Sequence, residues 1–389
     1  MNRILFICHD ASRTGAPIGL LAFMQWLKAN RGCEIGTILR NPGPLQPGFA
    51  ELGPMLTLGS TLFHRTRLGR RMRERLPESL WSEQGKVRRF FEAGRYELVY
   101  SNTATNGAIL SALGGYGVPI LTHVHELQYW LTRIGTENLA AVKAHTRFYV
   151  AASQAVRDNL VRNHGVAPEG IAVVYEHIRE LPVVPSPQQK AAAREALGIP
   201  AYAVVIGGCG AEHWRKGRDV IPQLLIALRR ITPARDFRFL WVGRAGSAEE
   251  EYALRYDLSS SGLADKFHTS GETADPFRVF PAFDAFALLS RDDPYPLACL
   301  EVAAMECPVV CFLEAGGIPE FIRDGCGLAV PYLDLSAMAE AFVSLANTPA
   351  EARRFGVNAR AKVARENLPE TTGPQLWEAM ERCIATKHC

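Results

Sequence analysis

Short runs of apolar and β-branched residues alternate along this chain with longer stretches of helical character. Such alternation is typical of parallel sheets that are covered by helices on both faces. In the first half, the runs predict strands at 4–9, 34–39, 96–102, 118–126, 146–153 and 170–176. In the second half, they predict strands at 203–210, 237–243, 266–271, 284–290, 308–313 and 327–331. The pattern therefore predicts an α/β fold with two Rossmann-like domains and mostly parallel sheets.

A proline-rich interruption separates the two series of strands. Residues 177–200 contain four prolines and no strand pattern until a new start near 203. Such a stretch is typical of a linker, and 389 residues suffice for two domains of ordinary size. We therefore expect the following division of the chain: an N-terminal domain at 1–180, a linker at 181–200, a second domain at 201–365 and a C-terminal helix at 366–389.

Charge adds one local feature to this picture. The formal net charge of +3 is too small to indicate nucleic acid as a partner, although it suits a ligand with a few negative charges. A basic cluster between 65 and 75 admits three interpretations: a solvated helix face, a patch for anionic membrane lipids, or a grip on a phosphate-bearing acceptor. The cluster consists of Arg65, Arg67, Arg70, Arg71, Arg73 and Arg75.

Cysteine usage and hydropathy indicate the compartment. The nine cysteines are scattered without a CxxC pair, which favours buried thiols in a reducing environment over a disulfide or zinc framework. Every apolar run is interrupted before about 18 residues, so no membrane span is expected. The N-terminal segment has the pattern of a first strand and not of a signal peptide. We expect a cytoplasmic protein.

Ligands of open α/β sheets bind beyond the carboxyl ends of the strands, so candidate chemistry is sought in those loops. The loop at 9–17 places Gly15 before a helix that can begin at Pro17, and it fits either an anion site or an ordinary turn. A GxGxxG pattern is missing there, and no acid ends the second predicted strand. A nicotinamide-dependent oxidoreductase is therefore disfavoured.

The loop at 207–219 combines glycines with cations. It opens with three glycines after a strand, and Arg215 and Lys216 then precede a helix. Glycines beside cations at a helix start suit a diphosphate. The alternative is a glycine-rich turn with solvated cations.

Two carboxylates flank the loop and helix start after the strand at 284–290. Asp293 lies in the loop, Pro296 can begin the helix, and Glu301 lies about two turns further along. A sugar nucleotide offers hydroxyl groups to a carboxylate and phosphate oxygens to the backbone N–H groups of a helix start. The alternative makes Asp293 a helix cap and Glu301 a solvated helix residue.

Taken together, these motifs resemble the retaining GT-B glycosyltransferases of the group 1 or family four type. Their paired glutamates, eight positions apart, correspond to Asp293 and Glu301 in "DPYPLACLEVAAMECPVV". "EAGGIPEFIRDG" resembles the family's glycine-rich donor loop, "RKG" at 215–217 its phosphate-binding segment, and "THVHE" at 122–126 its N-terminal histidine motif. The resemblance runs through nearly the whole chain and implies two domains that face a central cleft.

The resemblance implies a role for each matching residue. Glu301 would hold the ribose hydroxyls, Asp293 would contact the transferred sugar, and Lys216 would neutralise the departing diphosphate. His125 would lie near the donor sugar as a neutral imidazole that makes one hydrogen bond. The remaining expected donor contacts are Gly15, Gly210, Arg215, Pro294, Tyr295, Pro296, Leu297, Gly316 and Gly317, and the expected acceptor contacts are Asn102 and Glu126.

The family further implies a nucleotide-diphosphate sugar as donor, a saccharide or lipid-linked saccharide as acceptor, and no required cofactor or metal. The acid pair in "RDD" at 291–293 leaves Mg²⁺ open. Envelope polysaccharide synthesis at the inner membrane face is the expected setting, and the last helix, with Trp377 and Met380, is expected to pack back on the N-terminal domain. The rival functions are a GT-B sugar-nucleotide epimerase or hydrolase, and a two-domain sugar-binding protein without catalysis.

Overall fold

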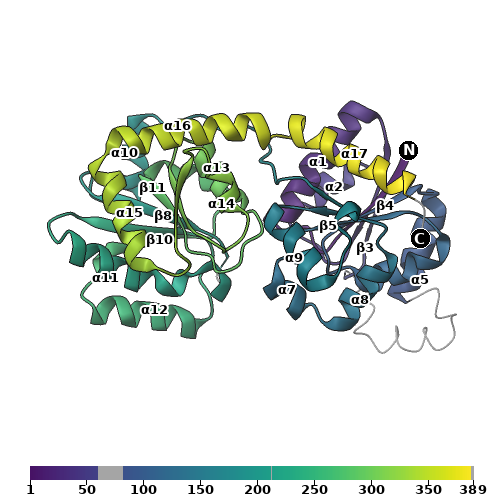
Figure 1. The fold of residues 1–389 in the computed structure, drawn as a ribbon, viewed down its shortest axis with the longest axis horizontal. Coiled ribbons are helices and arrows are strands. Elements are labelled where there is room, and N and C mark those ends of the chain that lie inside the picture. Colours follow the sequence, from purple (N-terminus) through teal and green to yellow (C-terminus); the bar gives the residue numbers. More distant parts are fainter. Residues whose placement is uncertain (60–81, 212, 387–389) are drawn as a thin grey trace. The chain divides into compact units, whose positions relative to one another are not determined.

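A computed structural model of the chain describes residues 1–59, 82–211 and 213–386 and contains two compact units (Figure 1). The first unit combines Met1–Arg179 with Pro369–Cys389, and the second is Glu180–Leu368. The arginine cluster at 65–75 lies outside the described residues, so its three interpretations stay open. Within the described ranges, every helix is too short or too polar to cross a bilayer.

The first unit is built on a seven-stranded sheet in the order β3-β2-β1-β4-β5-β6-β7, and all neighbouring strands run parallel. Its central strands are buried on both faces, as in Ile4–Cys8 of β1, where no residue is exposed. The strands are β1 Arg3–Cys8, β2 Glu34–Leu39, β3 Met55–Thr57, β4 Leu98–Asn102, β5 Ile120–Val124, β6 Phe148–Ala151 and β7 Ile171–Val173.

Helices cover both faces of this sheet. On one face, the C-terminal helix α17 lies beside α1 (Figure 1). Its residues Leu376 and Met380 are buried in the same core as Met24. A second core, with Leu110 and Val156, fills the other face. The helices are α1 Gly15–Arg31, α2 Gln46–Ala50, α5 Glu83–Gly94, α6 Gly107–Leu113, α7 Gln128–Arg133, α8 Thr136–His145, α9 Gln154–His164 and α17 Pro369–Ala385, with 3-10 turns at Gly114–Tyr116 and Pro168–Gly170.

The second unit has a six-stranded parallel sheet in the order β10-β9-β8-β11-β12-β13. Its strands are β8 Val204–Cys209, β9 Phe237–Val242, β10 Phe267–Gly271, β11 Ala285–Leu288, β12 Val309–Phe312 and β13 Gly327–Val330. Its helices are α10 Pro187–Ala196, α11 Ile221–Ile231, α12 Ala248–Ser260, α13 Leu297–Ala304, α14 Ile318–Phe321, α15 Leu335–Asn347 and α16 Pro349–Glu366. The 3-10 turns are η4 Trp214–Lys216, η5 Arg218–Val220, η6 Ala264–Lys266, η7 Pro276–Arg278 and η8 Phe280–Ala282.

The predicted α/β class with parallel sheets is confirmed, and each predicted strand overlaps an observed one. Sequence reasoning missed β3, which has three residues and pairs only with β2. The proline-rich stretch at 181–200 also contains more structure than a linker requires. Helix α10 begins there with a capping box. The Ser186 side chain accepts from the N–H of Gln189, and the Gln189 side-chain oxygen accepts from the N–H of Ser186.

Strand order changes direction once in each sheet. β1 lies between β2 and β4, and β8 lies between β9 and β11, so neighbouring loops at the carboxyl ends of these strands diverge to opposite faces. This divergence leaves room for a ligand at the sheet edge. The loops after β1 and β4, and those after β8 and β11, are therefore the places where each unit offers a site.

Candidate functional site

Two loops meet at the change of strand order in the second sheet. The loop after β8 carries Arg215 and Lys216 in the short turn η4, and the loop after β11 carries Asp293. The Lys216 Nζ donates to Asp293 Oδ2 at 2.5 Å, and Arg215 Nη1 lies 3.3 Å from Asp293 Oδ1. The structure thus brings together three of the side chains that the sequence singled out.

Asp293 is the centre of this cluster. Its side chain is only 5% exposed, and Ser290 Oγ also donates to Oδ2 at 2.8 Å. Burial by itself raises the pKa of this carboxyl group, but the charges of Lys216 and Arg215 outweigh it, so the pKa lies below its ordinary value. Asp293 is therefore an anion, and the predicted cap role does not apply because Pro296 occupies the cap position of α13.

Lys216 can donate more hydrogen bonds than the one it gives to Asp293. A lysine ammonium offers three donors, and the described contact with Asp293 uses one of them. Arg215 Nη1 also donates to the Asp292 carbonyl at 2.9 Å, which joins the two loops. The cations are thus held in place while retaining donors that can meet an anion.

The backbone of the acidic loop is tied to the glycine-rich loop. The Asp293 N–H donates to the Ala315 carbonyl at 2.8 Å, and Asp293 forms an isolated parallel bridge with Gly316. The Gly317 N–H donates to the Pro294 carbonyl at 3.0 Å. The predicted donor loop therefore lies beside Asp293, although the N–H of Gly317 already has a protein partner.

Helix α13 begins directly after this loop. Tyr295 and Leu297 are buried, and the Tyr295 ring packs edge-on against Phe321, so these side chains belong to the core. Only the backbone groups of Tyr295, Pro296 and Leu297 are therefore left to contact a ligand. The roles expected for these residues and for Pro294 stay predictions.

Glu301 is the second carboxylate of the predicted pair and lies on α13. Its side chain is half-buried, it lies within electrostatic range of Cys209 at the end of β8, and it forms no hydrogen bond or ion pair with the described residues. Burial raises the pKa of this carboxyl group to about 7. Its surroundings are thus unlike those of a solvated helix residue.

Gly210 and Gly217 shape the cation loop. A Cβ atom on Gly210 would lie 3.4 Å from the Lys216 side chain, and Gly217, with φ of 71°, follows η4. A Cβ atom on Gly217 would lie 2.0 Å from the Leu289 carbonyl oxygen. Only glycine allows the loop after β8 to approach the loop after β11 this closely.

We expect Gly217→Ala to destabilise the chain by about 2 to 4 kcal/mol, because it adds left-handed backbone strain and a clash with Leu289. Gly198→Ala is the matched control, since Gly198 has φ of 64° but open space around its Cα. The control is expected to cost about 1 kcal/mol. Urea unfolding of both variants measures the difference, and equal losses would contradict the argument from close approach.

The first unit places His125 at the carboxyl end of β5. Its Nε2 lies 2.8 Å from Asn102 Oδ1, and its Nδ1 contacts Glu176 Oε1. Glu176, which follows β7 and is buried, is a residue of this region that the sequence analysis did not single out. Both ring nitrogens thus have a protein partner, where the sequence predicted a single hydrogen bond, and the neutral state and the place near the donor sugar stay predictions.

Asn102 and Glu126 hold His125 and its loop. Asn102 Nδ2 donates to the Ala16 carbonyl at 3.0 Å, beside Gly15 at the start of α1. The Glu126 carboxylate accepts from the N–H groups of His125 and Ala104, at 2.9 and 3.2 Å. Both side chains are buried and bound to the protein itself, and their acceptor role, like the donor role of Gly15, stays a prediction.

His123, His125 and Glu176 are the one group among the described residues whose nitrogen and carboxylate atoms could approach a metal ion together, since these atoms lie within 4.8 Å of one another. His123 Nδ1 is hydrogen-bonded to the Tyr100 hydroxyl at 2.7 Å. Because His125 also has partners on both nitrogens, we describe this group as a hydrogen-bonded network and assign it no metal.

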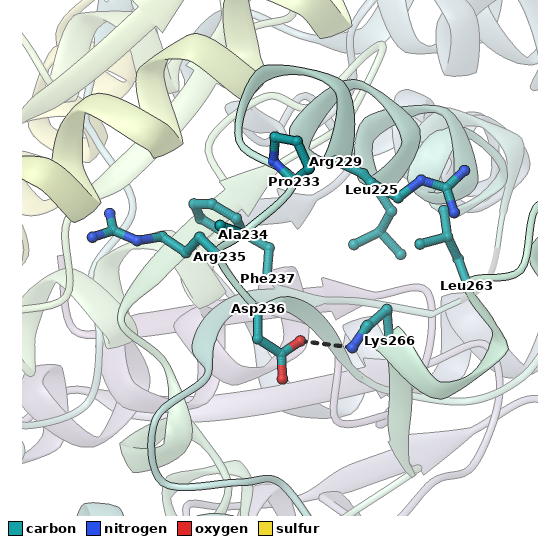
Figure 2. A pocket seen from close by; sticks show the side chains of 9 residues that line it. All are labelled: Leu225, Arg229, Pro233, Ala234, Arg235, Asp236, Phe237, Leu263 and Lys266. Atoms are coloured by element: carbon teal, nitrogen blue, oxygen red, sulfur yellow. Dashed lines mark hydrogen bonds and ion pairs between the residues drawn. The ribbon is translucent and has the colours of Figure 1, made fainter.

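A separate hollow of about 180 Å³ lies in the second unit. Figure 2 shows that its lining includes Asp236 and Lys266, which are joined by an ion pair of 2.9 Å. These residues precede β9 and β10, whereas Lys216 and Asp293 follow β8 and β11. Since all these strands are parallel, the hollow lies at the opposite edge of the sheet from the charged cluster.

Two family models match the chain in succession. One is described as Glycosyltransferase Family 4 and matches residues 14–179, and the other is described as Glycosyl transferases group 1 and matches residues 202–348. A D-inositol 3-phosphate glycosyltransferase of Saccharomonospora viridis is 28% identical, over 90% of this chain and 85% of that protein. The lipopolysaccharide core biosynthesis mannosyltransferase LpsB of Rhizobium meliloti is 30% identical, over 40% of this chain and 45% of LpsB.

Solved structures share the fold over almost the full length. Anabaena HepE, in complex with UDP and glucose, aligns with a TM-score of 0.79 and 21% identity, and covers 98% of this chain and 100% of its own. Sucrose-phosphate synthase from Thermosynechococcus elongatus aligns with a TM-score of 0.75 and 19% identity, over 100% of each chain. The fold is that of a GT-B glycosyltransferase. The chain belongs to the group 1 glycosyltransferases, and the resemblance predicted from its motifs is confirmed.

Proposed function

We propose that this glycosyltransferase takes a nucleotide-diphosphate sugar as donor and transfers the sugar, with retention, to a saccharide or lipid-linked saccharide. The observation that carries the proposal is the cluster of Lys216, Arg215 and Asp293 at the carboxyl edge of the second sheet. Two cations held close together suit a diphosphate, whose negative charge grows as the sugar departs. The complex of HepE with UDP-glucose favours the same class of donor.

Each residue has a defined task in this proposal. Lys216 and Arg215 bind the diphosphate and stabilise it as a leaving group, and Glu301 accepts hydrogen bonds from the ribose hydroxyls. Asp293 orients Lys216 and lies where the transferred sugar would be bound. The first unit supplies the acceptor side, with His125 at the carboxyl edge of its sheet.

The proposed setting is envelope polysaccharide synthesis, at the cytoplasmic face of the membrane. The names of relatives support it, since LpsB acts in lipopolysaccharide core biosynthesis and the structural neighbour WaaG is involved in lipopolysaccharide biosynthesis. No residue of the second unit's charged cluster requires a cofactor in this scheme, because Lys216 and Arg215 supply the positive charge that a metal ion would otherwise provide.

A donor panel tests this function. We expect calorimetry with UDP, GDP and dTDP sugars to detect selective binding of one donor, with slow release of the free nucleoside diphosphate when acceptor is absent. Addition of acceptor saccharides should then yield a product whose anomeric configuration, measured by NMR, equals that of the donor. Absence of binding by the folded protein, inversion of configuration, or a product that is only an epimerised or hydrolysed donor would contradict the proposal.

A further inference from the structure

Glu176 is a buried acid that the proposed reaction has not yet used. It follows β7, and its side chain is only 8% exposed. Strands β5, β6 and β7 are neighbours and run parallel, so the residues after β5 and β7 emerge at the same edge of the sheet. There the Glu176 carboxylate contacts Nδ1 of His125, which is 10% exposed.

The other side of the His125 ring faces a second acceptor. Nε2 lies 2.8 Å from the side-chain oxygen of Asn102. The orientation of this amide is fixed, because its nitrogen donates to the Ala16 carbonyl at 3.0 Å. A carboxylate and an amide oxygen can only accept, so both ring nitrogens must carry a proton for both hydrogen bonds to form. The geometry is that of an imidazolium.

The charged and titratable groups around the ring agree with this state. His9, His123 and His177 face it from the ends of β1 and β5 and from the segment after β7, and burial lowers the pKa of each of them. Burial also acts to lower the pKa of His125, but the charge and hydrogen bond of Glu176, with the charge of Glu126, raise it above its ordinary value. Among these four histidines, His125 is thus the one whose pKa lies above its ordinary value.

We propose that Glu176 is a positioning residue for His125: its carboxylate fixes the ring in one orientation with both nitrogens protonated. This inference rests on the proposed transferase function for its catalytic meaning. A ring that donates from both nitrogens has no lone pair, so His125 acts as a fixed cationic group and neither removes a proton nor attacks the sugar. Without Glu176, burial would leave His125 neutral, as it leaves His123.

The test compares Glu176→Gln and Glu176→Asp with the wild-type protein, all labelled with ¹⁵N in histidine. The glutamine keeps an acceptor near the ring but removes the charge, and the aspartate restores the charge on a shorter side chain. His125→Ala is avoided because it would leave the buried Glu176 without its partner. Glu169→Gln, at an exposed position of the same unit, is the matched control.

In the wild-type protein at pH 8, we expect both His125 ring nitrogens to give the NMR shifts of protonated nitrogens. In Glu176→Gln, one nitrogen should lose its proton near neutral pH, and turnover should fall about 10- to 100-fold at pH 8 and recover in part toward pH 6. The donor KM should change little, and Glu176→Asp should restore most of the protonation. The control should match the wild type throughout.

The proposal is overturned if wild-type His125 has an unprotonated ring nitrogen at neutral pH, or if Glu176→Gln keeps the wild-type ring shifts and pH–rate profile. If the proton resides on Glu176 instead of His125, wild-type His125 will show an unprotonated ring nitrogen. If the wild-type protein turns over no nucleotide sugar, the proposed function fails by itself, and the ring shifts still decide whether Glu176 holds His125 as an imidazolium.

Discussion

Lys216→Ala is expected to lower sugar transfer by about 100- to 1000-fold while the chain remains folded. The ammonium of Lys216 is one of two cations at the carboxyl edge of the second sheet, where the diphosphate is proposed to bind. Its removal takes away charge stabilisation of the leaving group, and this loss should appear mainly in kcat. Single-turnover release of nucleoside diphosphate, measured with saturating donor, separates this effect from weaker binding.

The second unit provides a close control for this variant. Lys190 pairs with Asp284 at 2.6 Å, and Arg194 pairs with the same carboxylate at 2.5 Å, just as Lys216 and Arg215 share Asp293. Lys190→Ala therefore also removes a lysine from a shared aspartate, but before β11 instead of after it. We expect it to cost about 1 kcal/mol of stability or less and to leave turnover unchanged. Near-normal turnover in folded Lys216→Ala would remove the assignment of the diphosphate site.

Glu301→Gln is expected to weaken binding of the nucleoside diphosphate about 10- to 100-fold at pH 8, because an amide oxygen replaces a carboxylate that accepts from the ribose hydroxyls. The pKa of Glu301 is about 7, so the wild-type protein should bind more tightly as pH rises from 6 to 8. The variant has no such group to ionise and should bind with little dependence on pH. Calorimetry at pH 6, 7 and 8 measures both effects.

The same substitution should increase stability. The pKa of the Glu301 carboxyl group is about 7 in the folded chain, whereas its ordinary pKa is 4.5. The folded chain therefore keeps this proton up to about pH 7. The free energy of unfolding therefore falls as pH rises from 4.5 through 7. Glu301→Gln does not show this fall, because glutamine has no proton to lose. Allowing for partial exposure, we expect a gain of about 1 to 2 kcal/mol at pH 8 and almost none at pH 4.5. Glu340→Gln, at an exposed position of α15, should change neither stability nor binding.

A variant that is more stable and binds less would identify Glu301 as a residue kept for function. If Glu301→Gln instead binds nucleotide as tightly as the wild type at pH 8, the carboxylate has no part in the donor site. If it is less stable at pH 8, the carboxyl group makes a favourable contact in the folded chain. Either result would contradict the role proposed for this half-buried acid.

Much of the fold could be predicted because parallel strands buried on both faces leave continuous apolar runs, as in "ILFIC" of β1. The three-residue strand β3 leaves no such run, and the prolines around 185 concealed helix α10, whose capping box starts at Ser186. Local pattern thus predicted the long buried strands, and it missed a strand that is too short to show a pattern and a helix that begins among prolines.

The site was predictable only in part for a related reason. Arg215, Lys216 and Asp293 could each be found after a strand, but the pairing of Lys216 with Asp293 joins residues 77 positions apart. Glu176 is 51 positions from His125 and directly follows an apolar run, so it had the pattern of a strand end. Searching the end of β7 as closely as the ends of β5 and β11 would have found it. Its partner, however, is set by the order of strands in the sheet, which the sequence pattern does not specify.

The path of the chain also determines the order in which its parts can fold during synthesis. Helix α17, which leaves the ribosome after all the other described elements, completes the core of the first unit beside α1, which is made long before it. The second unit occupies 180–368 and is complete before α17 emerges. The unit that starts first must therefore finish last, with the α1 side of its sheet uncovered while the second unit is being made.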